Sequence, residues 1–120
     1  MRPHENLEVW KKAIQFVIEI CEATRDFPND EKFGLISQLR RAAVSIAANI
    51  AEGAGRKGSK EFVHFLSNSQ GSASEVETEL LIAKRLGYLQ QSRYTELMSS
   101  LDEIGRMITG LSQHLRTKSL

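Results

Sequence analysis

The sequence predicts an all-α protein, an antiparallel up-down-up-down four-helix bundle, on three observations. Apolar side chains recur at steps of three and four residues in four separate stretches, which is the period of one helical face. The connections between these stretches are short, which favours antiparallel neighbours. No stretch carries the pattern of a strand. At 120 residues, the whole chain, 1–120, is predicted to form one domain.

Composition narrows the class of protein. A hydrophobic content of 41% and a charged content of 26% are ordinary for a soluble globular protein. The net charge of +1 excludes a strongly basic arm or an acidic tail. Residues 1–6 lack the apolar run of a signal peptide, and no apolar stretch approaches the roughly 20 residues of a membrane span. We therefore predict a cytoplasmic protein with no membrane contact.

The first predicted helix, from Leu7 to about Asp26, carries two adjoining apolar stripes. One stripe consists of Leu7, Trp10, Ile14, Val17 and Cys21, and the other of Val9, Ala13, Phe16 and Ile20. Together they exceed the stripe of a little over ~100° that a surface helix of a monomeric bundle needs. We therefore predict a homo-oligomer whose subunit contacts include the second stripe, Val9, Ala13, Phe16 and Ile20. The lone cysteine, Cys21, is predicted to be a buried thiol.

The second predicted helix is rich in alanine. Asp30 is a fair N-cap for it, and Gly53 suits the C′ position after its last turn. Alanine is the best helix former, and a run of alanines lets neighbouring backbones come close. We therefore predict a central helix that is contacted on more than one side, through a face made of Ile36, Leu39, Ala43, Ile46 and Ile50.

The third and fourth helices follow after short turns. Residues 67–74 resemble a loop in composition, but the apolar period continues through them, so one long third helix is predicted. Ser59 is a candidate cap at its start, and Gly87 takes the C′ position at its end. Gly71 inside this helix predicts close packing there. Ser92 is a candidate cap for the last helix, whose seam is formed by Tyr94, Leu97, Leu101, Ile104, Ile108, Leu111 and Leu115.

The turn between the second and third helices holds a glycine pattern, Gly53-x-Gly55-x-x-Gly58. This spacing matches the dinucleotide-binding fingerprint, which needs a strand before it and a parallel sheet around it. Because a helix is predicted before it, we interpret the glycines as a helix cap and a tight turn. Backbone amides at the start of the third helix, with Arg56, Lys57 and Lys60, are a weaker candidate phosphate site.

Two further patterns involve acidic residues. Glu61-Phe62-Val63-His64 is half of a di-metal carboxylate motif, but such a site needs two copies, so His64 is predicted to lie on the surface. Glu75, Glu77 and Glu79 form either a solvated acidic face or, at Glu75 or Glu79, ion pairs with Arg40 or Arg41. We predict no catalytic residue, no metal and no cofactor, and hence a protein that is not an enzyme.

Basic charge gathers at one end of the predicted bundle. The N-terminus, the second connection and the C-terminus share that end, where cations outnumber acids. Ordinary surface charge accounts for this in a monomer, whereas a ring would repeat the patch and raise its field. The candidate nucleic-acid contacts are Lys11, Lys12, Arg56, Lys57, Lys60, Arg116 and Lys118.

Three segments resemble a known family: 38–53, Glu75-Val76-Glu77-Thr78-Glu79-Leu80 and Leu86-Gly87-Tyr88-Leu89. They are similar to the four-helix-bundle proteins encoded in intervening sequences of 23S ribosomal RNA genes, often labelled ribosomal proteins. That family is related to the accessory variability determinant of diversity-generating retroelements, a basic ring that binds nucleic acid. Members commonly carry proline at the position of Ala47 and serine at that of Ala48. The resemblance implies a homopentameric ring and supplies no catalytic residues.

These observations support two main hypotheses of function. The first is a non-enzymatic, ring-forming bundle that binds RNA or DNA non-specifically through its basic end. The second is a structural scaffold whose partner is another protein, without nucleic-acid binding. Salt-dependent retention of RNA favours the first hypothesis, and recovery of a protein partner without RNA favours the second.

Overall fold

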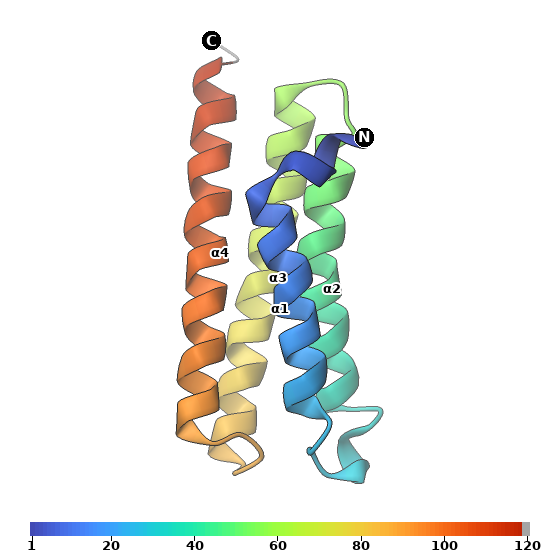
Figure 1. Ribbon diagram of the computed structural model, residues 1–120, viewed down its shortest axis with the longest axis vertical. Coiled ribbons are helices and arrows are strands. Elements are labelled where there is room, and N and C mark those ends of the chain that lie inside the picture. The colour runs from blue at the N-terminus through green and yellow to red at the C-terminus, as the bar shows by residue number, and fades with distance from the viewer. Residues whose placement is uncertain (119–120) are drawn as a thin grey trace.

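Four long helices lie along one axis in the computed structural model, which describes residues 1–118 (Figure 1). They are α1 (Glu8–Thr24), α2 (Leu35–Ala54), α3 (Ser59–Arg85) and α4 (Gln91–Lys118). Two short 3-10 helices, η1 (Pro3–Asn6) and η2 (Asn29–Glu31), precede α1 and α2. The molecule measures 48 × 21 × 20 Å. The described residues contain no strand, so the prediction of an all-α protein with four helices is confirmed.

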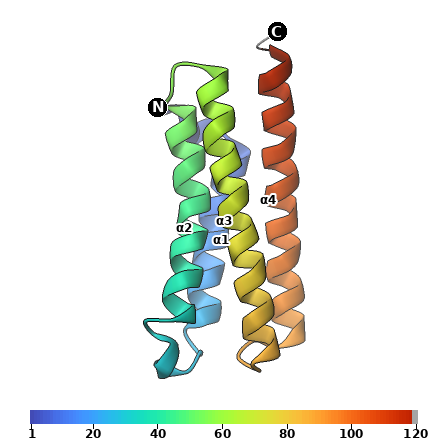
Figure 2. The same cartoon turned by 180° about the vertical axis from the view of Figure 1, so that it is seen from behind.

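Each long helix packs against two others. α1 and α3 both contact α2 and α4, and α2 also contacts η1 and η2, as predicted for a helix touched on more than one side. Figure 2 shows α2 and α3 side by side, with α1 behind them. Between α1 and α4, Lys12 contacts Glu103 and Glu19 contacts Arg93, so residue numbers rise along one helix as they fall along the other.

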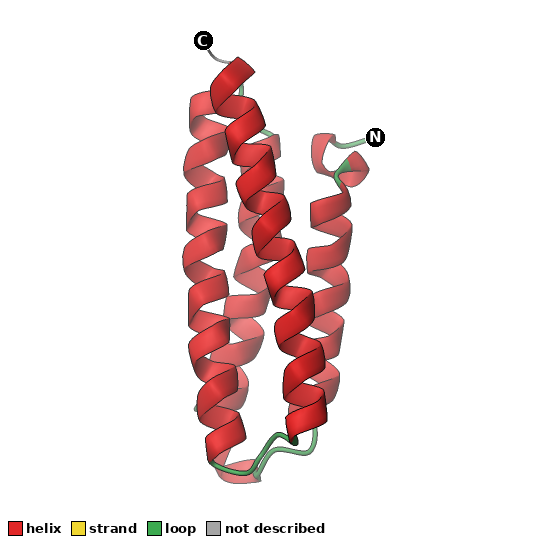
Figure 3. Ribbon diagram, turned by 90° about the vertical axis from the view of Figure 1, so that its left-hand side faces the viewer, coloured by secondary structure: helices red, strands yellow, loops and turns green. Residues whose placement is uncertain are grey.

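The helices differ in length, and this places their ends at different levels. α1 has 17 residues, against 27 in α3 and 28 in α4. Figure 3 shows loops only at the two ends of the bundle, with η1 turned across the start of α1. The ring of His4 in η1 packs edge-on against Trp10, with 4.7 Å between centroids. The first turns of α1 therefore lie below the upper end of α4.

The core follows the predicted helical faces. Leu97, Leu101, Ile104, Ile108 and Leu115 of α4 are buried, as predicted for the seam. The other two seam residues, Tyr94 and Leu111, are partly buried against the core. Small side chains let α2 approach its neighbours, since Ala42, Ala43 and Ala47 are buried beside the larger residues of the same face.

The polar middle of α3 is helical because its serines have partners on α2. The Ser69 hydroxyl donates to the Ile46 carbonyl at 2.9 Å, and the Ser72 hydroxyl donates to the Ser45 hydroxyl at 2.8 Å. Both serines are buried, so unpaired hydroxyls there would be costly. The prediction of one long third helix is confirmed.

The close approach of α2 and α3 occurs at Gly53 and not at Gly71. Gly53 lies inside α2, where an added Cβ would stand 2.8 Å from Cβ of Phe65 and 2.9 Å from Cδ1 of Phe62. Gly71 has nothing within 4 Å of the same position, so the prediction of close packing there is wrong. The predicted C′ role of Gly53 is also wrong, because the helix continues to Ala54 and Gly55 follows it.

One predicted helix cap forms and another does not. Gly87 has a φ of +82°, the N–H of Tyr88 donates to the Ala83 carbonyl, and the N–H of Gly87 donates to the Lys84 carbonyl. These two bonds form the predicted glycine cap of α3. Asp30, by contrast, lies in η2, and the N–H of Leu35 at the start of α2 donates to Oε1 of Glu31 at 3.2 Å.

The remaining caps differ from the predictions by one or two residues. Ser59 is the first residue of α3, after the N-cap Gly58, and makes no capping bond through its side chain. α4 begins at Gln91, one residue before the predicted cap Ser92. None of the helices within residues 1–118 is apolar over a length that would cross a bilayer.

Candidate functional site

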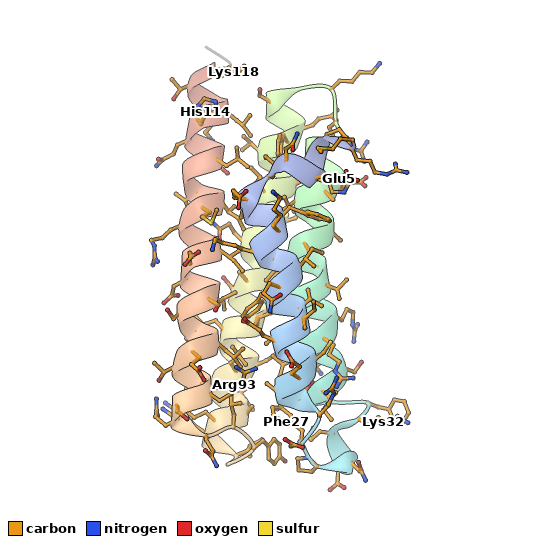
Figure 4. All side chains as sticks on the ribbon, in the orientation of Figure 1. Glu5, Phe27, Lys32, Arg93, His114 and Lys118 are labelled. Atoms are coloured by element: carbon orange, nitrogen blue, oxygen red, sulfur yellow. The ribbon has the colours of Figure 1, made fainter. Side chains whose placement is uncertain are left out.

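One end of the bundle gathers basic side chains from segments distant in sequence. The N-terminus, the α2–α3 turn and the end of α4 meet there, as Figure 1 shows. Figure 4 labels Glu5, His114 and Lys118 at this end, and Phe27, Lys32 and Arg93 at the opposite end. The side chains of Lys57, Lys60, Arg116 and Lys118 are exposed and form no ion pair with any described residue. We call these four residues the basic end.

Two other candidate cations, Lys11 and Arg56, already have acidic partners close to them in the sequence. Lys11 forms an ion pair with Glu8 at 3.2 Å, one turn away on the same helix. Arg56 pairs with Glu52 and lies over the Phe65 ring, 4.9 Å from its centroid. Both charges are therefore partly neutralised within the chain and contribute less to an external field.

Lys12 lies away from the basic end, contrary to the prediction. Its ammonium contacts Oε1 of Glu103 at 2.7 Å, near the middle of α4, because α1 starts below the upper end of that helix. The hydrogen bond raises the pKa of Lys12 and lowers the pKa of Glu103. Lys12 therefore serves the contact between α1 and α4.

A groove between α3 and α4 leads away from the basic end. It encloses about 180 Å³ and is lined by hydroxyl and amide side chains next to Arg116, namely Ser67, Gln70, Thr109, Ser112 and Gln113. The amide of Gln70 donates to the Gly105 carbonyl and to the Thr109 hydroxyl, both at 3.0 Å. These groups place hydrogen-bonding atoms beside a guanidinium, which suits a phosphate and sugar backbone.

The predicted subunit interface on α1 is wrong in its residues. Val9, Ala13, Phe16 and Ile20 have exposed fractions of 4%, 1%, 1% and 0%, because this stripe faces inward between α2 and α4. Side chains without exposed surface have no area to offer a neighbouring subunit.

The adjoining side of α1 faces outward instead. Ile14 and Ile18 are 38% and 47% exposed, and Val44 of α2 is 49% exposed. Cys21 is half-buried at this side, so the prediction of a buried thiol is wrong. The excess apolar surface of α1 therefore lies on the stripe that contains Ile14.

A second groove runs between α2 and α3. It encloses about 430 Å³ and is lined by Gln38, Arg41, Ala42, Ser45, Ser72, Glu75 and Glu79. Glu79 is 8% exposed, and its Oε1 has no hydrogen-bond partner among the described residues. Burial, and then the Glu75 carboxylate, raise the pKa of Glu79, whereas Arg41 lowers it.

The predicted pairing of these glutamates with Arg40 or Arg41 does not occur as an ion pair in the described chain. The Arg40 side chain turns to α1 instead, where Nε donates to Oγ1 of Thr24 at 2.9 Å and Nη2 to the Cys21 carbonyl at 3.3 Å. The burial of Glu79 was not predicted from the sequence. One signal was available, because Glu79 lies three residues after Val76 and four before Ala83, which are both buried.

The other candidate chemistries find little support in the geometry. His64 is exposed, as predicted, and its ring lies 5.6 Å from that of Phe65. Within residues 1–118, no three His, Cys, Asp or Glu side chains are grouped so that they could hold a metal ion. The glycine turn follows α2, a helix, so it lacks the strand that a dinucleotide site requires.

Comparison with known proteins gives a family match and a structural match. A family model described as "23S rRNA-intervening sequence protein" matches residues 5–110. No curated protein matches the chain. A crystal structure of a protein of unknown function from the S23 ribosomal protein family of Bacteroides thetaiotaomicron is similar, with a TM-score of 0.81 and 24% identity. The match covers 88% of this chain and 95% of that chain, and it shows a shared fold.

Proposed function

The chain belongs to the 23S rRNA-intervening sequence protein family, and on this premise we propose that it is a non-enzymatic ring of helical bundles that binds RNA or DNA. The binding surface is the basic end, and the ring is a homopentamer, as the family resemblance implies. Neither part depends on a catalytic group, a metal or a cofactor.

The observation that carries the nucleic-acid part of the proposal is the set of four cations at one end that form no ion pair within residues 1–118. Lys57 and Lys60 come from the α2–α3 turn and the start of α3, and Arg116 and Lys118 from the end of α4. Flexible lysines beside a turn offer no rigid element for reading bases, so contacts go mainly to phosphates. Binding is then largely indifferent to sequence and weakens with salt as condensed counterions are released.

The ring part of the proposal is supported by the outward face of α1. Ile14 and Ile18 lie one turn apart and expose apolar surface that the bundle itself does not cover. An up-down-up-down topology, supported by the paired contacts of α1 with α4 and of α2 with α3, puts all copies of the basic end on one rim. Five copies of the patch raise the local field, which strengthens phosphate binding.

A titration with single-stranded RNA and DNA at two salt concentrations tests this proposal. We expect the parent to bind both, and the K57Q/K60Q/R116Q variant to bind at least about tenfold more weakly at low salt with a shallower salt dependence. The matched control, K32Q/K84Q/R85Q, removes three cations at the opposite end and is expected to bind like the parent. Equal binding by both variants, or no binding by the parent, refutes the nucleic-acid proposal.

The alternative function, a scaffold for another protein, is favoured by a different observation. At the end opposite the basic residues, Phe33 is 88% exposed and Leu86 is 55% exposed. Large apolar side chains that are exposed at one end of a bundle offer surface for a protein contact. If the parent retains no RNA but a pull-down recovers a partner that the F33A variant loses, the scaffold is the better account.

A further inference from the structure

The α2–α3 groove holds a buried acceptor that the described residues leave unsatisfied. Oε1 of Glu79 has no hydrogen-bond partner within residues 1–118, whereas the other buried polar side chains, Thr24, Ser69 and Ser72, all form hydrogen bonds. Leaving a buried acceptor unpaired is costly, and more so for a charged group. The groove therefore favours a donor that comes from outside the chain.

The charges around this acceptor specify the kind of donor. Glu79 and Glu75 line the groove one turn apart on α3, and Arg41 faces them from α2 without an ion pair within 4.0 Å in the described chain. Two carboxylates against one guanidinium leave the groove with net negative charge when all three are ionised. A single additional cation with N–H donors, a guanidinium or an ammonium, matches both the charge and the missing bond.

A closed ring requires two different surfaces on each copy, because its contacts are head-to-tail. The face of α1 with Ile14 and Ile18 supplies the first surface. Arg25 lies seven residues after Ile18, on the same side of the helix, and is exposed without an ion pair among the described residues. The second surface, which would receive this face, therefore needs an acceptor for an arginine.

The groove and Arg25 lie at the same level along the bundle. Thr24, the neighbour of Arg25, accepts a hydrogen bond from Arg40, and Arg41 beside it lines the groove. In a ring whose axis runs along the bundles, residues at equal levels meet. Ile82, three residues after Glu79 and 44% exposed, adds apolar surface next to the groove for the α1 stripe.

We propose that Arg25 of one copy enters the α2–α3 groove of the next copy and donates to Glu79 and Glu75. This inference rests on the proposed ring and names the surface that receives α1. The guanidinium supplies the donor that Glu79 lacks and neutralises the surplus carboxylate. The α1 face and the α2–α3 groove are different surfaces of the same copy, so the contact between them repeats from copy to copy around a closed ring.

A charge-reversal cycle, read by sedimentation equilibrium of the full chain, tests the contact. We expect Arg25→Glu and Glu75→Arg each to raise the dissociation constant of the ring at least about tenfold, since each leaves a charge opposite one of like sign. The double variant is expected to return to within about threefold of the parent, because the pair is restored in reverse. Glu79→Gln, which keeps the side-chain shape, is expected to weaken assembly without reversing the charge.

Glu77→Arg is the matched control, because Glu77 is exposed on the same helix but lines the α3–α4 side. It is expected to leave the dissociation constant unchanged. A parent that stays a single chain at micromolar concentration overturns both the ring and the contact. A ring that forms in the parent and is unaffected by Arg25→Glu and Glu75→Arg, or that the double variant fails to restore, overturns this inference and leaves the ring standing.

Discussion

The α1–α4 groove and the α2–α3 groove of this bundle differ in how their charged side chains are paired. The groove between α1 and α4, of about 150 Å³, has an apolar floor that includes Phe16 and Ile104, and Lys12 reaches across it to Glu103. The groove between α2 and α3, of about 430 Å³, has a buried carboxylate, Glu79, whose Oε1 has no hydrogen-bond donor among the described residues.

The charged groups of the α1–α4 groove pair with each other, whereas Oε1 of Glu79 in the α2–α3 groove has no partner among the described residues. Lys12 and Glu103 are each about half exposed, so both keep water contacts while they bridge two helices. Oε1 of Glu79 is buried without a hydrogen-bond partner within residues 1–118, which suits a site completed by another molecule. Four sets of substitutions test this contrast and the packing around it, and the largest effect is expected in the apolar floor.

Ile104→Ala is expected to reduce the free energy of unfolding by roughly 2–5 kcal/mol, through lost burial and the cavity left behind. Ile104 is 1% exposed and forms the floor of the α1–α4 groove. Denaturant unfolding measures the change. The control, Leu86→Ala, truncates a side chain that is 55% exposed and is expected to change stability by less than about 0.5 kcal/mol. Equal effects of the two would place Ile104 outside the core.

Gly53→Ala is expected to destabilise the α2–α3 contact by about 1–3 kcal/mol, since the new Cβ meets the backbone-proximal Cβ of Phe65 at 2.8 Å. Gly71→Ala, on the facing helix, is expected to change stability in the opposite direction. It has no atom within 4 Å of the added methyl, and it is expected to stabilise by up to about 1 kcal/mol through helix propensity. Thermal melts measure both changes. A lowered melting temperature for Gly53→Ala and a raised one for Gly71→Ala would locate the close approach at Gly53.

Glu79→Gln tests the unmatched carboxylate in the Arg25→Glu background, where the proposed subunit contact is absent. Because the folded pKa of Glu79 is raised above its ordinary value of 4.5, the folded state holds a proton that the unfolded state releases. Its contribution to stability therefore falls as pH rises from that value through the folded pKa. Gln at this position is expected to remove this fall and to stabilise the chain by about 1 kcal/mol at pH 7. Unchanged pH profiles would show that Glu79 is satisfied.

Glu103→Gln and Lys12→Gln are expected to have the smallest effects, because the pair is exposed and screened by salt. The pH dependence of stability has the opposite sign to that expected for Glu79. Lys12 lowers the pKa of Glu103, so the contribution of Glu103 is present above its ordinary pKa of 4.5 and is lost as pH falls through the lowered pKa. Melts at low and high salt measure the change, and an effect that does not shrink with salt would contradict this account.

Local features of the fold could be predicted from the amino-acid sequence. The apolar period of α4 identified its buried seam, and the unbroken period through residues 67–74 identified one long α3 despite loop-like composition. Gly87 was readable as the end of α3, because a positive φ at a helix end favours glycine whatever surrounds it. The three segments similar to the family also led to the family that the match over residues 5–110 shows.

Tertiary structure alone decided which faces meet. Two adjoining stripes of α1 are equally apolar in sequence, and only packing between α2 and α4 turned Phe16 inward and left Ile14 exposed. The start of α1 below the end of α4 moved Lys12 from the basic end to Glu103. The same holds for Glu79, whose burial depends on the rotation of α3 against α2. Helical period fixes angles within one helix, whereas the register and rotation between helices depend on side chains distant in the chain.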